Sequence, residues 1–493
     1  MSRRVPTPLR QPSATPSQRR TDLDKCSVGV VVRDDNRVQP GYTLISAGRE
    51  TYLIDEAGRV VHEWRSTSQV SVAYLLPNGH LLRDGSDDDG AHMTGLGGDA
   101  GCIEEVTWEN EVVWRFSKMP ADTHLTHHDL EPMPNGNVLA LCWRRVPSGD
   151  VPGRKPDLMP DGEVWDNIVI EIQPNGMGGA DEVWRWSFFD HLLQVHRTEG
   201  TPGSTPRDNP HLMHVNFCPQ GGLHGVRNRN TLFPDCKKRC RNMRHTATTA
   251  YEDTPGKTGE KDWLHCNSVS YCPSRNHILI NINVLSEMVI IDKGAPDDGM
   301  FQGFRWRWGN PASYDCGTRV DQKLFAPHYA NFIEEGLPGA GNVLVFNNGR
   351  GPDRLWSTVD EITPTESEPF SGIYTRSIGQ AFGPEEPCWS YGPRLGRKDS
   401  FFCSYLSSAH RLPNGNTLIC QGPQGIVFEI TSEGDEVWRY INPVCNDLGT
   451  VSVTRQGDSR TEGSYSLCLA RKYAPGFEAF VGRDLVPLRY LEG

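Results

Sequence analysis

One hairpin unit recurs along this chain: an extended segment ends in a tight turn, often Pro-Asn-Gly, and an aliphatic strand follows. Units that repeat in this way are typical of a β-propeller, in which each belongs to one blade around a central channel. Four of the copies begin with a histidine, so we expect these side chains to converge on the channel. The copies are Leu75–Leu82, His128–Leu141, His265–Ile282, His328–Phe346 and His410–Cys420.

A second type of hairpin alternates with the first and ends in a strand that carries Val and Trp. Period-two alternation and glycine turns are typical of paired strands. One hairpin of each type makes a four-stranded blade, so the copies of the second type predict an all-β, six-bladed propeller. These copies are Tyr52–Trp64, Cys102–Trp114, Ile168–Trp186, Met288–Trp308, Val427–Trp438 and a degenerate one at Ile373–Trp389.

The first type of hairpin lacks a sixth copy. We expect it near Val30–Ser46 or from Tyr465–Ala470, where pairing of the two chain ends would close the ring. The terminal Trp of each second hairpin is expected to pack between neighbouring blades, as part of the core.

Three stretches fall outside the repeats. Residues 1–28 are rich in Arg, Ser and Pro and have no apolar signal segment, so they are predicted to be a disordered tail before a propeller over 29–493. Residues 187–261 form a long irregular insertion, predicted to be part lid (Phe188–Phe217) and part mobile excursion (Cys218–Lys261). A shorter break covers Pro352–Gly383.

Composition excludes some classes of function. The net charge of −12 argues against a general nucleic-acid binder, and the basic run 227–244 is interpreted as a solvated loop. No apolar run reaches the ~18 residues that a membrane helix needs. Without a secretory signal or a membrane span, we expect a soluble protein, compatible with a cytoplasmic location. The 14 cysteines are scattered and do not decide the compartment, and the oligomeric state is undetermined.

The repeat phase selects among the 16 histidines. Asn267 follows His265 by two residues and should share its face, His127 should point away from the channel, and His410 is out of phase with Ser407 and is expected only to support the site. Counted back from the turns, the inner strands begin at Ser71, His128, His265, His328 and Ser407.

Two chemistries suit such a cluster. A neutral imidazole can act as a nucleophile while other histidines and amides stabilise the transferred group. Alternatively, His128, His265 and His328 could hold a transition metal such as Zn, Cu or Fe with an open position. A third interpretation is structural, in which the histidines are satisfied channel residues of a non-catalytic interaction scaffold.

Several motifs, in this order, resemble the arylsulfotransferase (ASST) family of PAPS-independent aryl-sulfate sulfotransferases. They include HHDLEPMPNGNVL, DWLHCNSVSY, RWRWGNP, FAPHYANF, GNVLVFNNGRG and RLPNGNTLIC, and the resemblance runs from about Gly41 to Val444. It implies a six-bladed propeller that moves a sulfuryl group from an aryl sulfate to a phenol through a sulfohistidine, without a cofactor.

Carried over by motif, the resemblance implies that His328 is the nucleophile and that His265, Asn267 and His128 support it. One position departs from the family pattern, because Asn283 stands where an arginine usually clamps the sulfate. Loss of a bidentate guanidinium predicts weaker transfer or a different substrate. Asn283 is therefore a candidate substrate-binding residue, and His410 is a second candidate that would act in support of the site.

Overall fold

The computed structural model describes most of the chain. The tail 1–26, the basic run and most of the predicted insertion, including its excursion, lie outside the described residues. Those described are 27–86, 93, 97–98, 100–117, 124–154, 162–193, 205–217, 261–295, 303–350, 354–393, 400–447, 450–460 and 464–493.

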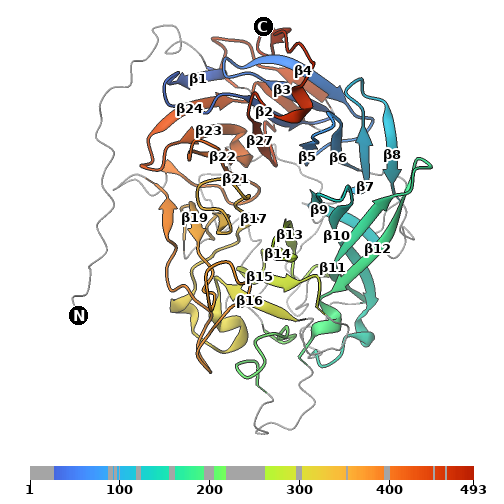
Figure 1. Ribbon diagram of the computed structural model, residues 1–493, viewed down its shortest axis with the longest axis vertical. Coiled ribbons are helices and arrows are strands. Elements are labelled where there is room, and N and C mark those ends of the chain that lie inside the picture. Colours follow the sequence, from blue (N-terminus) through green and yellow to red (C-terminus); the bar gives the residue numbers. More distant parts are fainter. Residues whose placement is uncertain are drawn as a thin grey trace.

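Six antiparallel sheets stand in a ring around a central channel, and each runs from an inner to an outer strand (Figure 1). This confirms the predicted all-β, six-bladed propeller. The blade that follows β4 in the chain contains β5 (Ala73–Leu75), β6 (Leu81–Ser86), β7 (Gly101–Val106) and β8 (Val112–Phe116). The next contains β9 (His124–Pro132), β10 (Val138–Pro147), β11 (Glu163–Pro174) and β12 (Ala180–Ser187).

The ring continues with three more blades in chain order. One consists of β13 (Cys266–Cys272), β14 (His277–Ile282), β15 (Glu287–Asp292) and β16 (Phe304–Trp308). Its neighbour consists of β17 (His328–Phe332), β18 (Val343–Asn347), β19 (Thr358–Ile362) and β20 (Trp389–Tyr391). The third consists of β21 (Ser408–Arg411), β22 (Thr417–Gln421), β23 (Ile426–Ile430) and β24 (Glu436–Ile441), with β1 (Gly29–Arg33) added outside.

The last blade joins the two ends of the chain. Its inner strand β27 (Ala470–Tyr473) pairs with β2 (Tyr42–Ala47), which brings Ile45 opposite Ala470. The two segments offered as alternatives for the missing hairpin therefore meet in this blade, because the end of Val30–Ser46 lies in β2 and the end of Tyr465–Ala470 begins β27. The blade is completed by β3 (Glu50–Ile54), β4 (Arg59–Arg65) and an outer β28 (Arg489–Tyr490).

Short elements decorate the ring. A separate hairpin consists of β25 (Val444–Asp447) and β26 (Thr450–Val453). The described helical turns are η2 (Ser148–Asp150), η4 (Phe189–His191), η7 (Pro311–Tyr314), η8 (Arg319–Asp321), η10 (Gly422–Gln424) and η11 (Glu478–Phe480). No helix in the described part of the chain is long and apolar enough to cross a membrane.

One predicted hairpin is wrong. Ile373–Trp389 is not a strand pair: β20 begins at Trp389, but its partner is β19, which lies within the stretch interpreted as a break in the repeats. The physical reason is burial, because Val359 and Ile362 are fully buried whereas Ile373 is 63% exposed. The connection between the two strands is long, so the turn spacing used for the other blades fails here.

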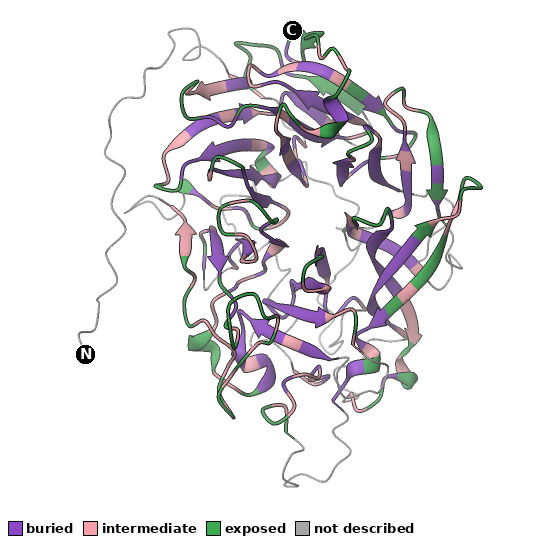
Figure 2. Cartoon of the chain, viewed as in Figure 1, coloured by how far each residue is buried: buried purple, intermediate pink, exposed green. Residues whose placement is uncertain are grey.

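The core lies between the blades, where the middle strands such as β14 and β18 are buried along their whole length, whereas the outer strands β8 and β12 are largely exposed (Figure 2). The tryptophans at the ends of the second hairpins belong to it. Trp64 and Trp438 are almost fully buried, and the indole N–H of Trp438 donates to the Glu56 carbonyl of the neighbouring blade (2.9 Å). Trp389 is only half-buried, at the irregular blade.

The predicted lid, Phe188–Phe217, is described in part, and that part does not cover the channel. Residues 205–217 lie along the outer strand β16, where the backbone N–H of Phe304 donates to His211 O (2.9 Å). Arg307, fully buried against Glu287, also donates to the carbonyls of Pro210 and Leu212. Backbone pairing at the outer edge thus fixes this segment away from the channel.

Candidate functional site

A β-bulge interrupts three neighbouring inner strands close to their histidines. The register shifts where β9 pairs with β10, where β13 pairs with β14 and where β17 pairs with β18. His128 (φ +57°), His265 (φ +49°) and Tyr329 (φ +47°) adopt the left-handed conformation. This backbone costs about 1–3 kcal/mol per non-glycine residue and is concentrated at functional sites. The bulges re-aim the side chains at the ends of these strands.

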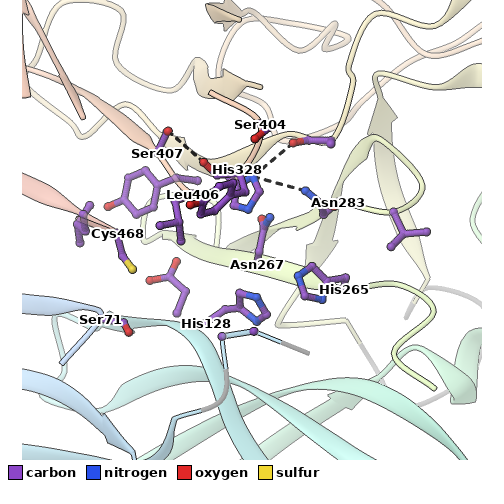
Figure 3. A pocket seen from close by; sticks show the side chains of 18 of the residues that line it. Ser71, His128, His265, Asn267, Asn283, His328, Ser404, Leu406, Ser407 and Cys468 are labelled. Atoms are coloured by element: carbon purple, nitrogen blue, oxygen red, sulfur yellow. Dashed lines mark hydrogen bonds between the residues drawn. The ribbon is translucent and has the colours of Figure 1, made fainter. Parts of the chain in front are cut away.

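A pocket of about 290 Å³ lies where these strands begin (Figure 3). It is lined by all five residues that the repeat phase placed at the inner-strand starts. Asn267 and Asn283 line it as well. His410 does not: it is buried, and its Nε2 accepts a hydrogen bond from the backbone N–H of Lys472 (3.1 Å). The structure therefore places His410 away from the substrate-binding position predicted for it.

His328 is held as one defined tautomer. Its Nδ1 lies 2.9 Å from Asn348 Oδ1, and the amide of Asn348 is oriented by a bond from its Nδ2 to Leu406 O (2.9 Å). Because the Asn348 oxygen only accepts, Nδ1 carries the proton and the lone pair is on Nε2. Burial lowers the pKa of His328 to about 4, so the ring is uncharged at neutral pH.

His265 has a carboxylate partner instead. Its Nδ1 lies 2.5 Å from Asp262 Oδ2, and its backbone N–H donates to Asp262 Oδ1 (3.1 Å). Asp262 is fully buried, and Asn167 Nδ2 donates to its Oδ1 (3.2 Å). Burial alone would raise the pKa of Asp262, but the charge and hydrogen bond of His265 bring it below its usual value. Asp262 is thus ionised, and it was not singled out from the sequence.

His128 packs its ring 4.5 Å from that of His265, centroid to centroid. On the other side, His127 Nδ1 lies 2.8 Å from His128 Nδ1, while the His127 ring stacks on Trp143 at 4.2 Å. Burial lowers the pKa of His127 to about 3, so it stays neutral. His127 does not line the pocket, although it contacts the histidine that does.

Three side-chain amides converge on one carbonyl oxygen beside His328. Asn267, Asn281 and Asn283 place their Nδ2 atoms 3.0, 2.7 and 3.0 Å from Pro327 O. Asn283 Nδ2 also lies 3.5 Å from His328 Nδ1. These amides fix the peptide that precedes His328. Sequence reasoning missed Asn281, although it lies two residues before Asn283 and both donate to the same oxygen.

Arg350 is the main lining residue that sequence reasoning missed. Its guanidinium donates to the carbonyl oxygens of Asn283 (3.3 Å) and Val284 (3.4 Å). Arg350 therefore lies beside Asn283, the position at which the family pattern has an arginine. It follows β18 in the motif FNNGRG. A cation directly after a strand that ends near the channel is the signal that could have identified it.

The described residues contain no group of three or more His, Cys, Asp or Glu arranged to hold a metal ion. The neighbouring lining residue Asp129 is buried, and burial raises its pKa to about 7. Asp129 therefore carries at most part of a negative charge at neutral pH. The pocket combines the neutral imidazole of His328 with the guanidinium of Arg350 and suits an anionic ligand.

The fold and the site together define the class of protein: it is a six-bladed propeller with a histidine-lined pocket in its channel. Within this class, the Arylsulfotransferase (ASST) family model matches residues 30–465. The chain belongs to this family, which confirms the resemblance of its motifs. No curated protein matches the chain in sequence.

Several solved structures resemble the chain distantly, at low sequence identity. A Bacteroides caccae protein of unknown function is 11% identical, with a TM-score of 0.41, covering 84% of this chain and 97% of its own. The β-propeller domain of Cps50 (Swd1) from Myceliophteria thermophila is 10% identical, with a TM-score of 0.37 and coverages of 84% and 89%. The periplasmic gluconolactonase PpgL of Pseudomonas aeruginosa is 11% identical, with a TM-score of 0.35 and coverages of 88% and 99%.

Proposed function

We propose that this protein transfers a sulfuryl group from an aryl sulfate to a phenol, with Nε2 of His328 carrying the group between them. One observation carries the proposal: the bond from His328 Nδ1 to Asn348 leaves a lone pair on Nε2 of an uncharged imidazole that lines the pocket. This is the form of histidine that can act as a nucleophile.

The other lining residues supply what the two substrates need. The Arg350 guanidinium offers charge-assisted hydrogen bonds to the sulfate oxygens. An apolar wall suits the aryl ring and is formed by Phe402, Tyr405, Leu406 and Leu469. The donor and the acceptor each carry an aryl ring on the reacting oxygen, so the same apolar wall can bind first one ring and then the other. The reaction requires neither PAPS nor a metal.

The test is a single-turnover experiment with 4-nitrophenyl sulfate and no added nucleotide. We expect a stoichiometric burst of 4-nitrophenol, a sulfuryl group on the peptide that contains His328, and turnover once phenol is added. His328→Ala removes all three signals. His277→Gln is the matched control, because His277 is also buried, with a pKa lowered to about 4, and lies outside the pocket. A burst that survives in His328→Ala contradicts the assignment of the nucleophile.

The pH dependence of the same burst follows from the burial of His328. Protonation removes the Nε2 lone pair, so the burst rate holds as pH falls below 6.5 and declines with an acidic limb near pH 4. An acidic limb at about pH 6.5, the ordinary pKa of histidine, would contradict the expected profile. Between pH 6.5 and pH 4, His277 and His328 bind protons in the unfolded chain but not in the folded protein. The free energy of unfolding therefore also falls as the solution is acidified over this range. Circular dichroism at each pH separates the two effects.

If His128, His265 and His328 held a metal ion, the same sample would give different results. An ion held by His128, His265 and His328 requires stoichiometric metal in the purified protein and loss of activity on chelation. The guanidinium of Arg350 in the same pocket opposes a second cation. Full activity in the presence of a chelator is therefore expected. A propeller that serves only as an interaction scaffold predicts no burst at all.

A further inference from the structure

Residues 402–407, the strap, form one side of the pocket. Figure 3 shows Ser404, Leu406 and Ser407 on the side where His328 lies. Three of the four side chains of the apolar wall belong to the strap, namely Phe402, Tyr405 and Leu406. An aryl ring bound in the pocket would therefore contact the strap more than any other segment.

The strap ends in two consecutive residues with a left-handed backbone, Leu406 (φ +53°) and Ser407 (φ +85°). Neither is glycine, so each costs about 1–3 kcal/mol and needs support from its surroundings. Gly422 gives this support, because its backbone N–H donates to Ser407 Oγ (3.0 Å). A Cβ on Gly422 would lie 2.7 Å from both Leu406 Cβ and Ser407 N. The conformation of the strap thus depends on a glycine that does not line the pocket.

The strap is joined at two points to Asn348, the residue that accepts from His328. Leu406 O accepts from Asn348 Nδ2 (2.9 Å). Ser357 Oγ accepts from the backbone N–H of Cys403 (2.8 Å) and donates to Asn348 O (2.6 Å). Asn348 is fully buried, so these partners decide how its amide is oriented.

We propose that the strap sets the tautomer of the nucleophile: the Leu406 carbonyl holds the Asn348 amide with its oxygen towards His328 Nδ1, and this keeps the lone pair on Nε2. The inference rests on the proposed function. With the amide turned over, Asn348 Nδ2 would face His328, and the ring would carry its one proton on Nε2 instead. Nε2 would then have no lone pair for sulfur. Asn348 is the positioning residue, and Leu406 acts through it.

The strap also makes the nucleophile respond to the kind of sulfate that is bound. An aryl ring that packs on Tyr405 and Leu406 buries apolar surface and stabilises the strap in this conformation. A small alkyl sulfate offers the same anion without this contact. We therefore expect aryl sulfates to be preferred in the burst rate at saturating donor, and not only in KM.

Gly422→Ala tests the link without altering a residue that lines the pocket. The added Cβ displaces the end of the strap, and the burst rate at saturating 4-nitrophenyl sulfate should fall by about 10- to 10³-fold. A reversed tautomer costs a catalytic histidine up to about 10⁴-fold, but Ala326 O, 3.3 Å from His328 Nδ1, still favours the reactive form. Gly317→Ala is the matched control, because its Cβ would lie 2.7 Å from Pro311 outside the pocket.

Nitrogen-15 NMR of the histidine rings reads the tautomer without turnover, and His328→Ala assigns the signal. In the wild type the His328 proton should be on Nδ1. Gly422→Ala, and Ser407→Ala as a milder second variant, should place part of it on Nε2. Adding Asn348→Asp to Gly422→Ala should restore the Nδ1 proton, because a carboxylate accepts from it whichever way it turns.

Two sulfonates separate the effect of the ring from that of the anion. Benzenesulfonate and methanesulfonate carry the same anionic group, and neither transfers it, because carbon replaces the ester oxygen. Only benzenesulfonate should return the His328 proton to Nδ1 in Ser407→Ala. Equal responses to the two ligands overturn the preference for an aryl ring.

The tautomer and the burst rate together decide the inference. A wild-type tautomer and burst rate in the strap variants overturn it, and Ser407→Ala alone decides if Gly422→Ala does not fold. Absence of sulfuryl transfer in the wild type instead removes the proposed function. The response of the His328 tautomer to the strap variants still tests the link in that case.

Discussion

At the scale of single residues, the site is defined by what lies behind each side chain. His328 and His265 are the same residue type in the same pocket, but an amide supports one and a carboxylate the other. The family motifs in the sequence pointed to both histidines as candidates. They did not identify Asn348, which lies 20 residues from His328. Partners of this kind are set by how strands meet across the sheet.

Arg350 offers a prediction at this scale. Losing its charge-assisted hydrogen bonds to the sulfate should cost about 1.5–3 kcal/mol, or roughly 10- to 100-fold in kcat/KM for the aryl sulfate. Arg350→Ala should show this loss, and Arg350→Lys part of it, because lysine keeps the charge but not the planar fork. Initial rates against donor concentration provide the measurement.

A second variant keeps that prediction independent of folding effects. Asn283→Arg in the Arg350→Ala background puts a guanidinium back on the segment that Arg350 contacts. We expect partial recovery of kcat/KM for the donor and little change for the acceptor. If Arg350→Ala binds the donor as well as the wild type does, Arg350 is not the sulfate ligand.

At the scale of elements, the bulges position the histidines and a glycine makes room for one of them. Gly98 (φ +81°) lies against the ring of His128, and a Cβ there would come within 2.2 Å of ring atoms. The His128 backbone N–H donates to Gly98 O (2.7 Å), so the two segments cannot separate easily. Bulge and glycine together determine where the His128 ring lies.

Gly98→Ala should therefore displace His128 and lower the transfer rate. Gly136→Ala is the matched control, because Gly136 has φ +85° but no atom within 4 Å of its Cβ position. Both variants pay the left-handed backbone cost of about 1–2 kcal/mol, measured by denaturant unfolding. Only Gly98→Ala should also lower the transfer rate, because only there does the new Cβ meet the His128 ring. Equal activity in the two variants would show that the contact with His128 has no functional weight.

At the scale of the whole molecule, the ring is closed by an inner strand from one end of the chain. Lys472 of β27 forms an ion pair with Glu429 of β23 in the neighbouring blade (2.8 Å), and both side chains are almost fully buried. Glu429 also accepts from the backbone of Gln39 and the side chain of Asn416, both at 2.6 Å. This pair therefore ties both terminal segments to the same neighbouring blade.

Lys472→Met leaves Glu429 buried without its cation and should lower the free energy of unfolding by about 3–5 kcal/mol. The double variant Lys472→Met, Glu429→Leu should recover much of that loss, because neither charge remains to be desolvated. Urea unfolding of the three proteins provides the comparison. A single variant as stable as the wild type would contradict the importance of this pair for closure.

The repeats predicted the number of blades, because hairpin periodicity and turn residues are local properties. The predicted inner-strand starts lie within two residues of the observed ones except at β9, which begins at His124 and not at His128. The same local reasoning failed at Ile373–Trp389, where a long connection separates β19 from β20. Local reasoning also did not indicate that residues 205–217, the last part of the predicted lid, pair with Phe304 through the backbone. Segments without periodicity take their place from contacts that the sequence does not encode locally.

The six-bladed propeller and the histidines at the channel could be read from the sequence, since both follow from hydrogen bonding and side-chain alternation within a hairpin. The closing strand was left open between two segments, because it pairs across the two ends of the chain. What the histidines contact depends on the tertiary structure. Arg350 reaches residues 66 and 67 positions away, and three amides meet at Pro327 O. Such contacts form only when neighbouring blades pack together, because they join segments of different blades at one pocket.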